Sequence, residues 1–270
     1  MPVLGLGVFQ MPAPDTRRII AMALEEGYRS IDTAPAYRNE AAVGRAVRDS
    51  GIERSELFIT TKLGNRSHGR SKGLAAFEES MEQLGLEYLD LYLIHWPVPA
   101  LGLYVETWEL LIELRESGRV REIGVSNFLP EHLARIIEAT GVAPVLNQIE
   151  LHPGFPQAAS RAFHAEHGIV TESWSPLAQA DARLLADPVL TGAAAAHNKT
   201  PAQVILRWHL QLGAVVIPKA SSRARLAENI DVFDFELTST EMAAIEEISA
   251  PGRLGWDPAT FVLPPGVPPL

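Results

Sequence analysis

Four residues that can carry or share a proton stand at, or just after, the expected ends of three β-strands. Asp32 ends the run YRSID and Tyr37 lies in the loop that follows, whereas Lys62 comes after LFITT and His95 after YLDLYLI. A phenol has a pKa of about 10 and donates protons poorly near neutrality, but a neighbouring ammonium stabilises the phenolate and lowers the pKa. A carboxylate would hold that ammonium in place, and a histidine could orient a substrate oxygen. Together the four residue types predict a site that donates a proton.

Each of these residues also has an ordinary structural explanation. Aspartate often closes a strand as a turn residue, Lys62 could be a lysine at a strand terminus, and His95 could be a core histidine bonded to the backbone. The joint pattern favours chemistry over coincidence. Asp32 and His95 could also begin a metal site, but no third ligand stands at a suitable spacing, so we expect no metal.

Short apolar runs alternate with amphipathic stretches along the chain, as in repeated β/α units. We expect strands at residues 4–8, 28–32, 57–61, 88–95, 120–125, 145–149, 169–174 and 214–218. Several of the helical stretches between them end at glycine, which commonly terminates helices. Eight such units in 270 residues predict an α/β fold, a single-domain (β/α)8 TIM barrel covering residues 1–270. Catalytic groups of such barrels stand at the C-terminal ends of the strands, as these four residues do.

Three further stretches bear on this architecture. An open doubly wound sheet that binds a dinucleotide should show a G-x-G-x-x-G pattern, but GLGVFQ supplies only the first two glycines. Beyond the last unit, TSTEMAAIEEI predicts an extra C-terminal helix with Thr238 or Ser239 as its N-cap and Glu241 in its first turn. The tail FVLPPGVPPL is rich in proline and predicts an irregular segment.

The composition limits the classes of function open to the chain. Hydrophobic residues make up 47% and charged residues 21% of the sequence, as in a globular protein. The net charge of −10 argues against general nucleic-acid binding, which needs a basic surface for phosphates. The chain has no cysteine, no long apolar run and no signal-peptide pattern. We therefore expect a soluble, cytoplasmic protein without membrane contact.

The site residues belong to motifs that run through nearly the whole chain. IDTAPAY, TTKL and LYLIHWP are followed in order by GVSNF, NQIELHP, ESWSPLA and IPKASSRARLAEN. These motifs resemble the successive signatures of the aldo-keto reductase family. Within the family the chain is most similar to the bacterial 2,5-diketo-D-gluconate reductases, in particular because Trp174 stands where many relatives have tyrosine. The resemblance implies a barrel that binds NADPH without a Rossmann motif.

The resemblance also implies roles for individual residues. Tyr37 would be the proton donor, Lys62 and Asp32 would tune it, and His95 would orient the carbonyl group. Trp174 would stack on the nicotinamide, which needs a flat aromatic partner. The other cofactor contacts would come from Ser126, Asn127, Gln148, Ser175, Leu177, Lys219, Ser221, Ser222, Arg225, Glu228 and Asn229.

Amide recognition needs paired donors and acceptors, which suits Ser126, Asn127 and Gln148 to holding the nicotinamide carboxamide. Gln148 has a structural alternative, because it could merely satisfy polar groups inside the barrel.

The segment PKASSRAR is the clearest basic island in this acidic protein and follows the eighth expected strand, where barrels often bind phosphate. By the resemblance, Lys219 and Arg225 would contact the adenosine 2′-phosphate, and Glu228 and Asn229 would face the adenine. Arginine suits bidentate binding of phosphate, which favours NADP over NAD. A solvated helix start is the structural alternative. Ala220 replaces an expected hydroxyl that one of the next two serines could supply, so we expect NADPH to be preferred and NADH to bind more weakly.

The expected substrate pocket also departs from the family pattern. Gly64 stands where relatives usually carry tryptophan, while Phe9 and Trp96 could still line the pocket. The pocket should therefore be wider, or its loop more mobile. We expect a monomer that reduces a small carbonyl compound such as an aldehyde, an α-dicarbonyl or a keto-sugar.

Two functions from other classes remain open on the sequence alone. One is a cofactor-binding regulatory or scaffold barrel with little turnover, as the potassium-channel β-subunits of this family suggest by analogy. The other is a barrel glycosidase that uses paired carboxylates such as Glu150 and Glu172. A glycosidase gives no reason for Lys62 or for the basic island. NADPH binding would exclude the glycosidase, and turnover would exclude the regulatory barrel.

Overall fold

The computed structural model describes residues 1–263 of the chain. Eight strands form one sheet, in which they lie in the order of the sequence from β1 to β8. The strands are β1 Leu6–Gly7, β2 Ser30–Asp32, β3 Phe58–Leu63, β4 Leu89–Ile94, β5 Val120–Ser126, β6 Leu146–Glu150, β7 Val170–Trp174 and β8 Val215–Val216. Each strand overlaps the run predicted for it, with bounds that differ by no more than two residues at either end.

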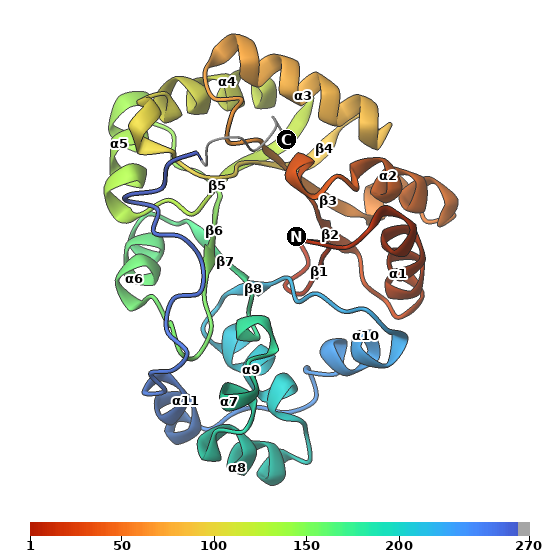
Figure 1. Cartoon of the computed structure of the whole chain (residues 1–270), viewed down its shortest axis with the longest axis vertical. Helices are drawn as coiled ribbons and strands as arrows, with labels where there is room; N and C mark the ends of the chain where they lie inside the picture. The colour runs from red at the N-terminus through yellow and green to blue at the C-terminus, as the bar shows by residue number, and fades with distance from the viewer. Residues whose placement is uncertain (264–270) are drawn as a thin grey trace.

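The sheet closes on itself. Leu4 forms a parallel bridge with Val216, and the Gly5 amide donates to the Val216 carbonyl oxygen at 2.8 Å, which joins the start of the sheet to β8. Every neighbouring pair of strands is parallel. Figure 1 shows the strands as a central ring with the helices outside it. The predicted (β/α)8 TIM barrel is confirmed, and the open doubly wound sheet is excluded.

Helices follow the strands and form the outer layer. They are α1 Ala13–Glu25, α2 Glu40–Asp49, α3 Arg70–Leu84, α4 Tyr104–Glu116, α5 Pro130–Thr140, α6 Ala158–Glu166, α7 Ala182–Leu185, α8 Pro188–His197, α9 Pro201–Gln211, α10 Arg223–Ile230 and α11 Ser239–Glu246. Short 3-10 turns lie at Pro35–Tyr37, Arg54–Glu56, Pro99–Leu101 and Ala178–Ala180.

Residues at the helix ends explain where the helices begin and stop. Thr200 and Gln203 each accept a hydrogen bond from the other's backbone amide, which forms a capping box at the start of α9. Thr238 and Glu241 form the same box at α11. The predicted extra helix is therefore confirmed, with Thr238 as its N-cap. Gly141 ends α5 with a φ of 70°, a left-handed conformation that costs glycine little.

Close packing between neighbouring helices keeps the barrel wall rigid. A Cβ atom on Gly44 of α2 would lie 1.8 Å from the Leu84 carbonyl oxygen, so only glycine allows α2 to approach the end of α3 this closely. Trp108 of α4 and Trp208 of α9 are completely buried. Side chains at the strand ends thus rest on a well-packed support.

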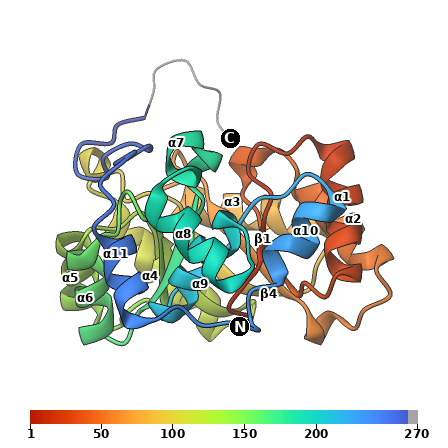
Figure 2. The same ribbon diagram turned by 90° about the horizontal axis from the view of Figure 1, so that it is seen from below.

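The chain beyond α11 returns to the barrel. In Figure 2 the N-terminus lies at one end of the barrel, and the blue segment after α11 runs to the opposite end. Phe261, Val262 and Leu263 lie in no helix or strand, and the rest of the predicted irregular tail falls outside the described residues. None of the described helices is long and apolar enough to cross a lipid bilayer.

Candidate active site

The barrel brings three of the four predicted proton-handling residues into direct contact. Lys62 of β3 is completely buried, and its Nζ atom donates to Asp32 Oδ1 at 2.5 Å and to the Thr33 carbonyl oxygen at 3.0 Å. The same Nζ lies 3.4 Å from the Tyr37 hydroxyl. Asp32 ends β2 and Tyr37 ends the 3-10 turn that follows, so the adjacency of β2 and β3 positions the three groups.

His95 directly follows β4 and completes the group. Its ring and that of Tyr37 meet edge to face, with centroids 5.9 Å apart. Burial, with help from the Lys62 charge, lowers the pKa of His95 well below its usual value. The imidazole is therefore neutral and carries one N–H donor. Its Nδ1 atom is buried and has no hydrogen-bond partner among residues 1–263.

The ionisation of Lys62 and Tyr37 follows from burial and from their neighbours. Burial disfavours the Lys62 ammonium, but Asp32 and Tyr37 outweigh that cost and raise its pKa. Burial also raises the pKa of Tyr37, and Lys62 only partly opposes this effect. Lys62 thus lowers the pKa of Tyr37 in the expected direction, but the net pKa lies above its ordinary value because the phenol is buried, which the sequence does not reveal. The phenol is protonated at neutral pH, while Lys62 stands ready to stabilise the phenolate.

Behind this group lies the carboxylate of Glu172, which was not predicted to belong to the reductase site. Gln148 Nε2 donates to Asp32 Oδ2 at 2.9 Å and to Glu172 Oε2 at 2.7 Å. Gln148 lies in β6 and Glu172 in β7, and both are buried. The amide nitrogen of Gln148 therefore satisfies polar groups inside the barrel, as the structural alternative for this residue expected. The Gln148 Oε1 atom accepts no hydrogen bond from the described residues.

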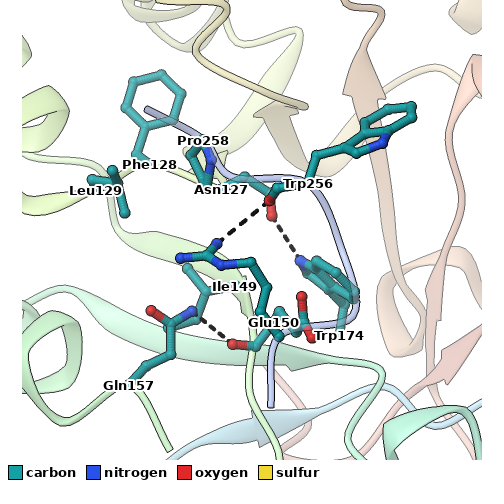
Figure 3. Close-up of a pocket in the computed structure, with 10 residues that line it drawn as sticks. Asn127, Phe128, Leu129, Ile149, Glu150, Gln157, Trp174, Trp256 and Pro258 are labelled. Carbon is teal, nitrogen blue, oxygen red and sulfur yellow. Dashed lines mark hydrogen bonds between the residues drawn. The ribbon is translucent and has the colours of Figure 1, made fainter. Parts of the chain in front are cut away.

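Three further residues predicted to contact the cofactor form a chain of hydrogen bonds at the ends of β5 and β7. The Asn127 amide nitrogen donates to the His95 carbonyl oxygen and to Ser126 Oγ, each at 3.0 Å. Trp174 Nε1 donates to Asn127 Oδ1 at 2.8 Å, as Figure 3 shows. Ser126 Oγ donates to the Gln148 carbonyl oxygen at 2.8 Å. The indole plane of Trp174 is thus fixed before any ligand binds.

The loop after β7 carries the other two residues predicted from ESWSPLA. Ser175 has a φ of 49°, and both Ser175 and Leu177 are half-buried beside Trp174 in the chain. They lie at the carboxyl end of the barrel, on the same strand end as the indole.

The basic island surrounds the start of α10. Ser222 caps this helix, since its hydroxyl accepts from the Arg225 amide. Arg223 is held by Glu25 and Glu26 of the α1 end. Lys219 and Arg225 are exposed and form no ion pair within residues 1–263. Two free cations thus remain beside a helix N-terminus, which is a favourable place for an anion.

The other residues predicted to contact the adenosine end of the cofactor differ in exposure. Ser221 is exposed, whereas Asn229 is buried at 4% exposure. Glu228 accepts a hydrogen bond from the Thr200 hydroxyl at 2.6 Å, which ties its carboxylate to α9. One carboxylate oxygen of Glu228 is therefore already engaged with Thr200 in the absence of a ligand.

A segment after α11 covers one side of the site. The Glu150 carboxylate accepts from the Leu254 amide at 2.6 Å, from the Gly255 amide at 2.8 Å and from His152 Nε2 at 3.1 Å. A Cβ atom on Gly255 would lie 2.6 Å from the Trp174 ring, so this backbone rests directly on the indole. Figure 3 shows the pocket between this segment and the ends of β6 and β7. Glu150 thus holds the segment over the barrel. This role could not be predicted from the sequence, because the residues in contact are more than 100 positions apart.

Two groups of aromatic side chains include the residues predicted for the substrate pocket. Phe9 is 51% exposed, and its ring meets the edge of Tyr37 with centroids 5.0 Å apart. Trp96 packs against Phe261 at 4.8 Å and faces Trp256 at 6.1 Å. The sequence indicated Phe9 and Trp96 but not the two aromatic residues of the C-terminal segment. Those two pack against Trp96 and against each other.

The two carboxylates considered for a glycosidase are both engaged elsewhere. Glu150 binds the C-terminal backbone, and Glu172 binds Gln148 inside the barrel. No group of three or more potential metal-binding side chains occurs in the described part of the chain. The geometry defines a (β/α)8 barrel protein in which an aspartate, a tyrosine, a lysine and a histidine meet at the carboxyl ends of the strands.

Comparison with known proteins identifies the family. Residues 3–250 match the Aldo/keto reductase family. An aldo-keto reductase from Mycolicibacterium smegmatis is 55% identical over 261 residues, which cover 97% of this chain and 94% of that protein. Methylglyoxal reductase DkgA from Escherichia coli is 50% identical over 261 residues, with the same coverage. The chain belongs to the aldo/keto reductase family, and the predicted oxidoreductase class is confirmed.

Solved structures agree with this assignment. The crystal structure of Gox0644 matches with a TM-score of 0.92 at 52% identity, covering 97% of this chain and 95% of that one. A variant of Gox0644 was crystallised in complex with NADPH, and its structure matches equally well with a TM-score of 0.92. The cofactor bound by that relative is the one predicted from the sequence.

Proposed function

We propose that this protein is an NADPH-dependent carbonyl reductase in which Tyr37 donates the proton. One observation carries the proposal: the Tyr37 hydroxyl lies 3.4 Å from a buried Lys62 ammonium that is paired with Asp32. A phenol in this position is neutral before reaction, and an adjacent cation stabilises the phenolate that proton transfer leaves behind.

The residues of the chain divide the work of the reaction. When bound, NADPH supplies a hydride from nicotinamide C4 to the carbonyl carbon. Tyr37 gives its proton to the carbonyl oxygen, and neutral His95 donates its N–H to the same oxygen and orients it. Lys62 remains charged because Asp32 holds it, so it attracts the developing phenolate.

The cofactor assignment rests on groups that are free to bind it. Lys219 and Arg225 carry charge without an ion pair in the described structure, which suits a 2′-phosphate. Gln148 Oε1 and the fixed Trp174 ring suit the carboxamide and the face of the nicotinamide. Ser126, Asn127, Ser175, Leu177, Ser221, Ser222, Glu228 and Asn229 would complete the site.

Small carbonyl compounds are the proposed substrates, with aldehydes, α-dicarbonyls and keto-sugars as the first to test. The relative named methylglyoxal reductase supports this range, as does a mouth lined by Phe9, Trp96, Trp256 and Phe261. No observation favours a regulatory barrel without turnover.

Isotope transfer tests the proposal. NADPH that carries deuterium in both positions at nicotinamide C4 should deliver one deuterium to the carbonyl carbon of methylglyoxal that is reduced, as mass spectrometry of the product would show. Product without deuterium, or no product from any carbonyl in a broad panel, would contradict the proposed reaction.

A further inference from the structure

Glu172 is a buried acid that has no role in the proposed reaction as described so far. It is the third residue of β7 and is 1% exposed in the barrel interior. Inward positions of such barrels usually carry apolar side chains, and a buried carboxylate costs free energy unless it is paired. Within residues 1–263 no lysine or arginine forms an ion pair with it. Because burying this carboxyl group is unfavourable, we looked for a function of Glu172 in the chemistry of the site.

The hydrogen bonds around Glu172 lead to the proton donor. Gln148 Nε2 spans the two carboxylates, with 2.7 Å to Glu172 Oε2 and 2.9 Å to Asp32 Oδ2. The other oxygen of Asp32 holds Lys62 Nζ, which lies 3.4 Å from the Tyr37 hydroxyl. One continuous chain of hydrogen bonds therefore runs from β7 through β6, β2 and β3 to the phenol.

We propose that Glu172 is a positioning residue for proton transfer, which fixes Asp32 through Gln148 and whose negative charge keeps Tyr37 protonated at alkaline pH. The inference rests on the proposed function, because it takes Tyr37 as the proton donor.

The charged groups around Glu172 determine when this effect operates. Asp32 on β2 and Lys62 on β3 face it together with Tyr37, Gln148 on β6 is uncharged, and β8 contributes only Val215 beside it. Burial and then the Asp32 charge raise the pKa of Glu172 to about 8, while Gln148 and Lys62 act in the opposite direction. Glu172 is thus mostly neutral at pH 6 and becomes ionised as the pH rises through about 8. Once ionised, it raises the pKa of Tyr37 and of Lys62.

The pH profile of Glu172→Gln tests the inference. Glutamine retains an oxygen for Gln148 but carries no charge, so the alkaline limb of kcat should move down by about 0.5 to 1 pH unit. At about pH 6, where Glu172 is already neutral, kcat should stay within roughly threefold of wild type. Glu172→Asp, which keeps the charge, should restore the position of the limb. A folded Gln variant whose limb is unmoved, or whose kcat falls equally at every pH, would overturn the proposal.

A second measurement needs neither turnover nor cofactor. Ultraviolet difference titration of tyrosinate, with Tyr37→Phe subtracted, should show Tyr37 ionising at lower pH in Glu172→Gln than in the unsubstituted protein. Equal titration of Tyr37 in the two proteins would refute the role of Glu172 even if the protein reduced no carbonyl. Conversely, a shifted Tyr37 titration in an inactive protein would uphold the effect of the Glu172 charge on Tyr37 and contradict the proposed function.

If Glu172→Gln does not fold, carbon-13 spectra of glutamate-labelled wild-type protein still decide. One side-chain carboxyl should titrate at a pH of about 8, and the Tyr37 ring resonance should respond in the same range. No glutamate titrating in that range would overturn the proposal.

Discussion

Lys62 is the residue on which the chemistry of this site depends. It is completely buried, and burial would by itself favour the neutral amine. Asp32 at 2.5 Å keeps it charged, and Gln148 in turn holds Asp32. Tyr37, the proposed proton donor, is therefore flanked by a permanent positive charge that costs little to reorganise when a phenolate forms.

The first prediction concerns Tyr37→Phe. This change removes the proton donor but keeps the ring that packs against Phe9 and His95. We expect kcat to fall by roughly 10²–10⁴-fold, the usual contribution of a general acid, with NADPH affinity within about threefold of wild type. Steady-state kinetics and fluorescence titration of NADPH measure the two quantities. A folded variant that turns over normally, or that no longer binds NADPH, would contradict the assignment of Tyr37.

At the scale of elements, α10 and the segment after α11 are the parts of the fold in which we expect binding to be tested most directly. The α10 N-terminus presents Arg225 free of ion pairs in the described residues, while Arg223, two residues earlier, is held by Glu25 and Glu26. The two arginines have the same chemistry but different partners, so they form a matched pair for experiment.

Arg225→Ala should weaken NADPH binding by about tenfold and leave NADH binding nearly unchanged, because a charge-assisted hydrogen bond to the 2′-phosphate is lost. Arg223→Ala is the control and should affect both cofactors within about threefold. Fluorescence titration with each cofactor gives the four dissociation constants. Equal loss of NADPH and NADH affinity in Arg225→Ala would place the 2′-phosphate elsewhere.

Glu150 should control the segment that rests on Trp174. In Glu150→Gln one of the two acceptor oxygens becomes a donor facing a backbone N–H, so the contacts to Leu254 and Gly255 weaken. We expect amide hydrogen exchange at these two residues to accelerate by at least about tenfold, and KM for the carbonyl substrate to rise. Glu166→Gln, at an exposed position on α6, is the control. Unchanged exchange in Glu150→Gln would show that the segment is fastened by other contacts.

The whole molecule should be sensitive to acid because it buries neutral histidines. Burial lowers the pKa of His68 and of His164 to about 4 and that of His209 to about 3. An unfolded histidine has a pKa of about 6.5, so between these values the unfolded state binds more protons. Stability is therefore complete above about pH 6.5 and is lost as the pH falls towards 4.

Urea denaturation at several pH values measures this loss. The free energy of unfolding should fall by several kcal/mol between about pH 7 and pH 4.5, since each buried histidine can contribute about 3 kcal/mol. His68→Gln keeps a polar group facing the Trp96 carbonyl oxygen and should flatten the pH dependence. A free energy of unfolding that is constant across this range would contradict the prediction.

The features that could be predicted from the sequence also differ between the scale of the fold and the scale of single residues. The alternation of strands and helices predicted the barrel, and strand ends that converge at one face made Asp32, Tyr37, Lys62 and His95 recognisable as a group. The link between Gln148 and Asp32 was not predictable, because it joins residues 116 positions apart through the register of the barrel. The raised pKa of Tyr37 depends on burial, which no spacing reveals.

One experiment tests the central claim most directly. Purified protein is titrated with NADPH by fluorescence, and methylglyoxal or a diketo-sugar is then added to the same sample while NADPH absorbance is followed. We predict saturable binding, followed by oxidation of NADPH that depends on both the carbonyl and Tyr37. Binding without oxidation across a broad carbonyl panel would contradict the reductase and favour a regulatory barrel, and no binding by folded protein would contradict the cofactor site itself.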